Sequence, residues 1–266
     1  MLNSYQKRIV AFYTQRTNYD NDFTRDRALR LLVDAPVELG QSVLDVATGT
    51  GFVAIAAAAN VGKTGSVLGI DITPDYLAKA QVKCDLLGIH NLTLREIDEA
   101  ELDAAPESFD RIYCSSAIVL FPDIPATLKR WHKWLKPGGI VAFSCSTDTS
   151  FFTPQVIAAC LSQGIDLPNL HVPLGTIDRC RAQCQAAGFA QVEVNTVDLG
   201  EWMSLTIAQN RWNGRMWFHP QDPLPNLPAE TTDRIKAKFD RQIAAIATAQ
   251  GVWHEHLAFY VTAHKR

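Results

Sequence analysis

The stretch VLDVATGTGFVA, residues 43–54, predicts the fold of this chain. Its first five residues form a short apolar run interrupted by one acid, Asp45, as expected of a buried parallel strand. Thr48-Gly49-Thr50-Gly51 then turns the chain, and the alanine-rich run 52–60 favours a helix. Glycines let the backbone approach a ligand closely, and a helix start offers free N–H groups with partial positive charge. The stretch therefore predicts a ligand-binding strand–turn–helix unit.

The glycine pattern alone fits more than one class of enzyme. Gly49-x-Gly51-x-x-Ala54 matches the dinucleotide-binding fingerprint of nicotinamide enzymes. Asp71 ends the next apolar run, 67–71, where a dehydrogenase would place its ribose-binding carboxylate. Asp45, however, puts a second carboxylate just before the turn, where it would repel a dinucleotide diphosphate. The acid before the turn therefore argues against a nicotinamide cofactor.

Five segments in a fixed order favour a different class. They lie within residues 41–145 and read VLDVATGTG, VLGIDIT, EIDEAELDAAPESFD, IYCSSAIVLF and LKPGGIVAFS. Together they resemble the class I S-adenosylmethionine-dependent methyltransferases, especially the small-molecule type that includes the ubiquinone/menaquinone-biosynthesis C-methyltransferases. The resemblance implies an α/β, Rossmann-like fold: a doubly wound, mostly parallel seven-stranded sheet whose last strand is antiparallel. It also implies S-adenosyl-L-methionine as methyl donor and S-adenosyl-L-homocysteine as product.

The resemblance also implies which residues bind this cofactor. Asp71 would accept from the ribose hydroxyls, and Asp98, twelve residues before Asp110, from the adenine amino group. Glu99 departs from the small residue usual at its position. Ser115 follows the predicted fourth strand, at the end where open α/β sheets bind ligands. The full set of predicted cofactor residues is Tyr19, Asp45, Ala47, Gly49, Thr50, Gly51, Asp71, Ile72, Asp98, Glu99 and Ser115.

The rest of the chain is expected to complete one methyltransferase domain. Helices in residues 1–35 carry an aromatic stripe at helical spacing, which either packs on the core or, as in the resembled family, forms a lid over the cofactor. In that family a tyrosine in the place of Tyr19 commonly reaches the methionine carboxylate. The expected parts are an N-terminal helical lid (1–35), a cofactor-binding core (36–145), acceptor-pocket insertions and sheet (146–228), and a C-terminal helix (231–250) and strand (253–263) within 229–266.

Two aromatic segments, 146–175 and 202–228, interrupt the strand–helix alternation. They either cover the sheet edge or line an apolar acceptor cavity. On the second interpretation the acceptor contacts are Tyr13, Phe151, Trp202 and Trp217. The predicted reaction is methyl transfer to a small, fairly apolar molecule, with O-methylation in secondary metabolism preferred. The alternatives are C- or N-methylation of a quinone-type or amine acceptor, and a non-catalytic cofactor-binding protein of the same fold.

A hydroxyl acceptor would benefit from a base, and histidine titrates nearest to neutral pH. Two of the seven histidines, His171 and His219, lie in the aromatic segments and are the candidate catalytic residues. The alternative is transfer by positioning alone, without a protein base.

Composition argues against several other classes of function. A net charge of −3, from 25 basic and 28 acidic residues, gives no reason to expect nucleic acid as a partner. No apolar run approaches the roughly 18 residues that suggest a membrane span, and the N-terminus does not resemble a signal peptide. We therefore expect a cytoplasmic monomer or homodimer with a small-molecule acceptor. Cys180 and Cys184 lie four residues apart but lack a second pair, so no metal is expected.

Overall fold

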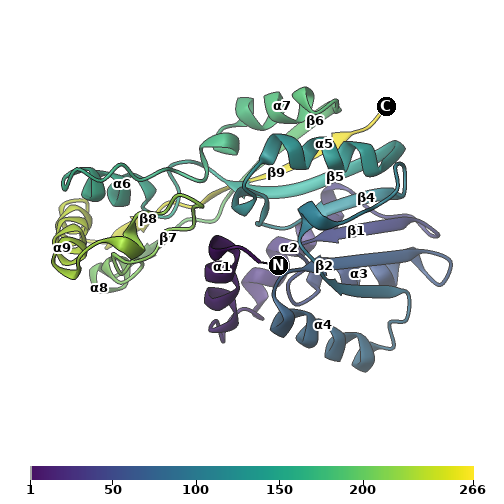
Figure 1. The fold of residues 1–266 in the computed structure, drawn as a ribbon, viewed down its shortest axis with the longest axis horizontal. Coiled ribbons are helices and arrows are strands. Elements are labelled where there is room, and N and C mark those ends of the chain that lie inside the picture. The colour runs from purple at the N-terminus through teal and green to yellow at the C-terminus, as the bar shows by residue number, and fades with distance from the viewer. Residues whose placement is uncertain (1) are drawn as a thin grey trace. The chain divides into compact units, whose positions relative to one another are not determined.

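The computed structural model describes residues 2–266 and divides into two compact units (Figure 1). The first unit comprises residues 1–145, 177–195 and 260–266. The second comprises residues 146–176 and 196–259. The chain passes between the units four times, after residues 145, 176, 195 and 259.

The first unit is built on a sheet with the strand order β3-β2-β1-β4-β5-β9-β6. β1 pairs in parallel with both β2 and β4, and β4 pairs in parallel with β5. Lys265 donates to Gly139 O at 2.9 Å, and Thr147 donates to Leu257 O at 3.1 Å, so β9 runs antiparallel to β5. The predicted seven-stranded, mostly parallel α/β sheet is confirmed. Its strands are β1 (Ser42–Val46), β2 (Ser66–Asp71), β3 (Leu92–Glu96), β4 (Phe109–Cys114), β5 (Leu135–Ser146), β6 (Ala190–Asp198) and β9 (Leu257–His264).

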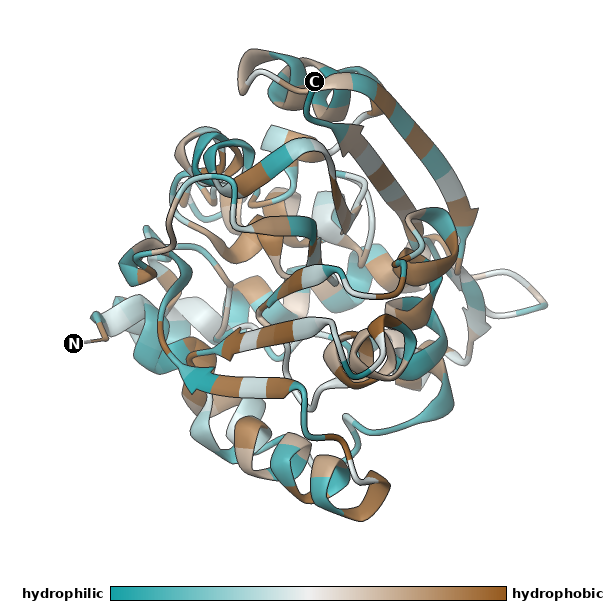
Figure 2. Ribbon diagram, turned by 90° about the vertical axis from the view of Figure 1, so that its right-hand side faces the viewer, coloured by the Kyte–Doolittle hydropathy of each residue, from teal (hydrophilic) through white to brown (hydrophobic). Residues whose placement is uncertain are grey.

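Helices connect the parallel strands. Right-handed crossovers and the strand order together place α3 and α4 on one face of the sheet and α5 on the other. In Figure 2 the helices alternate hydrophobic and hydrophilic bands, as expected when only one side of each helix meets the sheet. The helices of this unit are α1 (Ser4–Thr14), α2 (Asp22–Asp34), α3 (Phe52–Val61), α4 (Pro74–Leu87), α5 (Ile124–Trp134) and α7 (Ile177–Ala186).

The strand order changes direction between β1 and β4. The chain proceeds from β1 towards β3 on one side and from β4 towards β5 on the other. The loops that follow β1 and β4 therefore leave towards opposite faces and open a crevice at the carboxyl ends of these strands. This crevice is the expected ligand site of an open α/β sheet.

The second unit has its own hydrophobic core. Helices α6 and α9 supply its central side chains, among them Val156, Ile235 and Phe239, which are at most 1% exposed. Two short strands, β7 and β8, pair antiparallel beside them. Its elements are α6 (Thr153–Leu161), β7 (Glu201–Met203), α8 (Leu205–Gln209), α9 (Ala229–Ala245), β8 (Val252–His254) and the 3₁₀ turns Val172–Leu174 and Leu224–Asn226.

Two expectations about the C-terminal region were wrong. The predicted strand over 253–263 is broken into β8 and β9, because the carbonyls of Glu255 and His256 accept from Phe151 N and Leu199 N instead of from a sheet neighbour. The predicted helix over 231–250 ends at Ala245, after which Thr248 and Gly251 close a tight turn. The second unit also includes α9 and β8, and so is larger than the two expected insertions. Within residues 2–266 no helix is both long and apolar enough to span a bilayer.

Candidate functional site

The glycine turn after β1 adopts an unusual backbone conformation. Ala47, Gly49 and Gly51 have φ values of 54°, 57° and 87°, in the left-handed region that favours glycine. Thr48 N donates to Ile70 O at 2.9 Å and ties the turn to β2. A Cβ on Gly51 would lie 3.1 Å from the Ala80 side chain, so a larger residue would push α4 away. The glycines are therefore required both by conformation and by helix packing.

Asp45 holds this turn from beneath. Its carboxylate is 1% exposed and accepts from Thr48 Oγ1 at 2.6 Å and from Ala54 N at 3.1 Å. Burial raises its pKa to about 7, against the opposing effect of these two hydrogen bonds, and the nearby Asp71 raises it further. Asp45 thus shapes the turn and adds negative charge beneath it.

Asp71 joins the turn to β2 from the other side. Its Oδ2 accepts from Gly49 N and its Oδ1 from Thr73 N, both at 2.8 Å. The Ile72 backbone and the Thr73 side chain also hydrogen-bond this carboxylate. Burial raises the pKa of Asp71, while the backbone donors oppose that rise. The side chain is positioned as a pre-oriented acceptor at the carboxyl end of β2.

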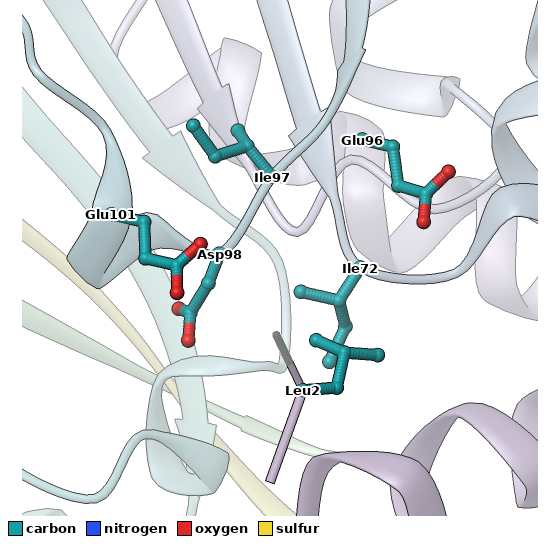
Figure 3. Close-up of a pocket in the computed structure, with 6 residues that line it drawn as sticks. All are labelled: Leu2, Ile72, Glu96, Ile97, Asp98 and Glu101. Atoms are coloured by element: carbon teal, nitrogen blue, oxygen red, sulfur yellow. The ribbon is translucent and has the colours of Figure 1, made fainter.

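A pocket of about 220 Å³ lies beyond the ends of β2 and β3 (Figure 3). Ile72 and Ile97 supply apolar surface, and Asp98 supplies a carboxylate that accepts from Ala100 N at 3.1 Å and from the Gln6 side chain. The other lining residues are Leu2, Glu96 and Glu101. The structure thus brings the predicted residues Ile72 and Asp98 together in one pocket, which is lined by three apolar side chains and three carboxylates.

Glu99, by contrast, is turned into the protein. Its carboxylate accepts from Arg130 twice, at 3.0 and 2.6 Å, from Trp131 Nε1 at 3.1 Å and from Thr127 Oγ1 at 3.3 Å. Four donors occupy its acceptor positions, so the side chain has none left for a cofactor. The family resemblance predicts Glu99 as a cofactor ligand. Its partners Arg130 and Trp131 lie some 30 residues away along the chain, and the sequence alone does not pair them with it. Its role here is to fasten the loop after β3 to α5.

Three tyrosines cover the glycine turn. Tyr13 and Tyr19 come from the N-terminal region and Tyr76 from α4, with ring centroids 4.7 to 6.3 Å apart. A Cβ on Gly49 would lie 3.1 Å from the Tyr19 hydroxyl, so Tyr19 uses the close approach that glycine permits. The Tyr76 hydroxyl is buried without a hydrogen-bond partner in residues 2–266. The Tyr19 hydroxyl thus lies against Gly49 of the turn, and Tyr13 packs on the Tyr19 ring.

Polar contacts fasten this N-terminal region to the core. Asp20 accepts from the Thr50 hydroxyl and pairs with Lys83 Nζ at 3.0 Å. Gln6 donates to Asp98, and Tyr5 donates to Leu120 O at 3.0 Å. Gln6 and Lys83 could not be predicted from the sequence as contact residues, because the partner of each is remote along the chain. Asp20 is adjacent to Tyr19 and could have been included with it.

Ser115 is half-buried at the carboxyl end of β4, directly beside the strand-order reversal. It is therefore at the edge of the same crevice as the glycine turn, on the opposite side of β1 from Asp71.

The remaining predicted residues lie in the second unit. Phe151 is 38% exposed and stands 5.7 Å, ring to ring, from His171, which is 8% exposed. Burial lowers the pKa of His171 to about 4, so it is neutral near pH 7 but a weak base. Burial also lowers the pKa of His219, whose Nδ1 accepts from Gln221 N at 3.1 Å. His171 directly precedes the 3₁₀ turn Val172–Leu174, whereas His219 lies in the segment between α8 and α9.

The predicted aromatic contacts differ in exposure. Trp202 is 47% exposed and packs edge to face on Trp253 across the β7–β8 pair, with ring centroids 5.4 Å apart. Trp217 is partly buried, packs against the second unit's core and donates from Nε1 to Pro168 O. Among the described residues, no group of three potential ligands is arranged to hold a metal ion, and Cys180 and Cys184 are fully buried thiols.

Comparisons with known proteins agree with this geometry. Residues 43–139 match the model of a family described as a methyltransferase domain. The nocamycin O-methyltransferase of Saccharothrix syringae is 28% identical over 195 residues, which are 67% of this chain and 69% of that protein. The demethylmenaquinone methyltransferase of Geobacillus stearothermophilus is 34% identical over 116 residues, 43% of this chain and 50% of that protein.

A solved structure shows the same fold. The phosphoethanolamine N-methyltransferase 2 of Haemonchus contortus, in complex with phosphomonomethylethanolamine and S-adenosylhomocysteine, superposes with a TM-score of 0.57. It is 18% identical, and the match covers 99% of this chain and 60% of that chain. The chain spans between 32% and 69% of the length of the curated relatives it matches.

Proposed function

We propose that this chain, which belongs to the class I S-adenosylmethionine-dependent methyltransferases, transfers a methyl group from that cofactor to a small molecule. The observation that carries the proposal is the placement of Asp71 and Asp98 just at the carboxyl ends of consecutive strands, Asp71 bonded to the glycine turn and Asp98 in the pocket beside Ile72 and Ile97. On this proposal Asp71 accepts from the ribose hydroxyls and Asp98 from the adenine amino group.

The charge of the site also suits this cofactor. Asp45 and Asp71 are both buried, and burial disfavours their ionised forms. A cationic ligand placed above them would relieve that penalty, and S-adenosylmethionine carries a sulfonium and an ammonium group. The pocket of about 220 Å³ is smaller than the 300–1,000 Å³ usual for a whole ligand, so it would receive the base end, with the remainder lying along the turn.

When bound, the cofactor supplies an electrophilic methyl group on a positively charged sulfur. The protein itself then orients the cofactor and the acceptor and excludes water from them. Gly49 and Gly51 let the backbone lie close to the ligand, and Tyr13, Tyr19 and Tyr76 form a largely apolar cover over it. An exposed acceptor nucleophile would lose rate because water would compete for the same space.

For the acceptor, we infer a small, fairly apolar molecule methylated on oxygen. The nocamycin O-methyltransferase is a relative with that named reaction, whereas the demethylmenaquinone methyltransferase keeps a quinone-type acceptor as the alternative. Phe151, Trp202 and Trp217 are the proposed aromatic contacts. A pKa of about 4 makes His171 a weak base, so His219 is the better of the two proposed bases.

Calorimetry and mass spectrometry test the proposal together. The protein should bind S-adenosylhomocysteine with measurable heat, and an extract of small molecules incubated with protein and S-adenosylmethionine should show a new species heavier by one methylene. Asp98→Asn should weaken binding, while Asp103→Asn, on the exposed loop nearby, should not. Tight binding of a nicotinamide dinucleotide with no heat from either adenosyl compound would overturn the proposal.

A further inference from the structure

Arg27, in the middle of α2, is a cation whose hydrogen-bonding capacity is not filled. Its Nη2 donates to Ser116 Oγ at 3.0 Å, and its guanidinium lies 5.3 Å from the centroid of the Phe23 ring. Its Nε is buried and has no hydrogen-bond partner within residues 2–266. The neighbouring arginines differ, since Arg25 pairs with Asp22 and Arg30 with Asp34. Arg27 is thus held in place by the hydroxyls of Ser116 and Tyr260 and by an aromatic ring instead of a carboxylate.

Ser116, the partner of Arg27, is held in a strained conformation. Its φ is 58°, in the left-handed region that a non-glycine residue seldom occupies. Its backbone N donates to Ser144 Oγ at 3.0 Å, and the two hydroxyl oxygens are 3.2 Å apart. Ser144 is 1% exposed, whereas Ser116 is exposed. The buried serine of β5 therefore fixes the exposed one, with its hydroxyl next to the guanidinium.

This pair lies at the edge of the cofactor crevice. Ser116 follows β4 by two residues, and the strand order reverses between β4 and β1. Both Arg27 and Asp71 act on the pKa of Tyr13: burial raises that pKa most, Asp71 adds to the rise, and Arg27 opposes it. One phenol on the lid is therefore within electrostatic reach of the proposed ribose-binding carboxylate and of Arg27. Arg27 and Ser116 therefore lie at the carboxyl-end crevice of the sheet, where the cofactor is proposed to bind.

We propose that Arg27 and Ser116 form an anion-binding subsite that recognises a carboxylate on the methyl acceptor; this rests on the proposed function. A carboxylate accepts from the guanidinium N–H groups and from the Ser116 hydroxyl, and charge-assisted bonds of this kind are about twice as strong as neutral ones. A single arginine matches the one negative charge of a carboxylate, whereas a phosphate dianion would leave a charge uncompensated. The carboxylate anchors the acceptor, so that a nucleophile elsewhere on the molecule faces the methyl group.

Arginine side-chain NMR tests the subsite without knowledge of the natural acceptor. In protein labelled at arginine Nε and saturated with S-adenosylhomocysteine, the Arg27 signal is identified by its loss in Arg27→Lys. Benzoate should shift this signal in a saturable manner, whereas benzamide, which has the same shape without the charge, should not. Arg27→Gln should weaken benzoate binding at least tenfold, and Ser116→Gly, which suits the positive φ, several-fold. Arg25→Gln on the same helix should leave it unchanged.

The outcomes separate this subsite from the proposed function. No shift with benzoate, equal shifts with benzamide, or a larger response to inorganic phosphate would overturn the carboxylate subsite. S-adenosylhomocysteine should bind wild type and Arg27→Gln with affinities within threefold, because Arg27 recognises the acceptor only. If wild type does not bind S-adenosylhomocysteine, the proposed function fails, while the benzoate response of Arg27 can still be measured in the protein alone.

Discussion

At the scale of single residues, the buried carboxylates of Asp45 and Asp71 have different roles at the glycine turn. Asp45 is 1% exposed, accepts from Thr48 and Ala54 near the same turn, and sets the shape of that turn. Asp71 is 9% exposed, accepts from Gly49 N and Thr73 N, and joins the turn to the carboxyl end of β2. Both acids were visible in the sequence, but only the structure shows which groups each of them holds.

Asp71→Asn is expected to weaken the binding of S-adenosylhomocysteine. The amide has one acceptor oxygen, which must serve the backbone donors, and its NH₂ cannot accept from a ribose. Loss of a charge-assisted hydrogen bond, about 1.5–3 kcal/mol, corresponds to roughly a 10- to 150-fold rise in Kd. Calorimetry measures this, with Asp75→Asn in the first turn of α4 as the control. Unchanged affinity in Asp71→Asn would remove this residue from the binding site.

The pKa of Asp45 predicts how stability depends on pH. Its folded-state pKa of about 7 lies above the value of about 4 for an unfolded aspartate, so the folded state binds the proton more tightly. The free energy of unfolding should therefore fall as pH rises from about 4 to 7, by up to about 1.4 kcal/mol per pH unit from this group. Asp45→Asn should lose that component. Denaturant unfolding at pH 5, 6 and 7 checks it; parallel pH profiles for the two proteins would contradict it.

His171 predicts the opposite dependence in the second unit. Burial lowers its pKa to about 4, below its ordinary value of 6.5, so the unfolded state binds the proton more tightly between these values. Its contribution to stability is present above pH 6.5 and is lost as pH falls towards 4. His171→Gln should reduce the acid destabilisation. Hydrogen exchange of residues 146–176 at pH 4.5 and 7 measures the effect, and an unchanged difference between the two pH values would exclude it.

At the scale of elements, the sequence predicts the alternating strands and helices but does not predict contacts between residues that are remote along the chain. The strands, helices and glycine turn of residues 43–145 follow from apolar periodicity and capping residues, since these signals are local. The break between β8 and β9 is made by hydrogen bonds from Phe151 and Leu199 to carbonyls in the run 253–263, which alternating hydrophobicity does not reveal. The Glu99–Arg130 pair and the Arg27–Ser116 contact likewise join positions that only the fold brings together.

Removal of the N-terminal helix α1 is expected to change the rate at which S-adenosylhomocysteine dissociates. α1 contributes the buried Tyr5 and Ile9 and the Gln6–Asp98 hydrogen bond, so its removal opens the base end of the pocket. Deleting residues 2–15 should speed dissociation of S-adenosylhomocysteine at least tenfold, since lids retain bound ligands. The two lost side chains represent about 3–4 kcal/mol of burial, and Tm should fall by roughly 6–16 °C. Stopped-flow competition measures the rate, and a wild-type rate in the truncated protein would show that α1 only packs.

At the scale of the whole molecule, the two units have different proposed roles. The residues proposed to bind the cofactor, among them Gly49, Asp71 and Asp98, belong to the first unit, as does the Arg27–Ser116 subsite. The second unit has a separate core around Phe239 and carries the aromatic residues proposed for the acceptor. Damage to the second core should therefore separate cofactor binding from methyl transfer.

Phe239→Ala makes that separation measurable. The ring is fully buried, 5.3 Å from the Trp212 ring and 6.3 Å from the Phe152 ring, and its loss leaves a cavity that costs about 3–5 kcal/mol. Hydrogen exchange should rise in residues 146–176 and 196–259, while the Kd for S-adenosylhomocysteine stays within twofold because its proposed contacts lie in the first unit. Ala237→Gln, at an exposed position of the same helix, should change neither. A loss of S-adenosylhomocysteine binding that parallels the rise in exchange would mean that the two units unfold together, and the division of labour would not hold.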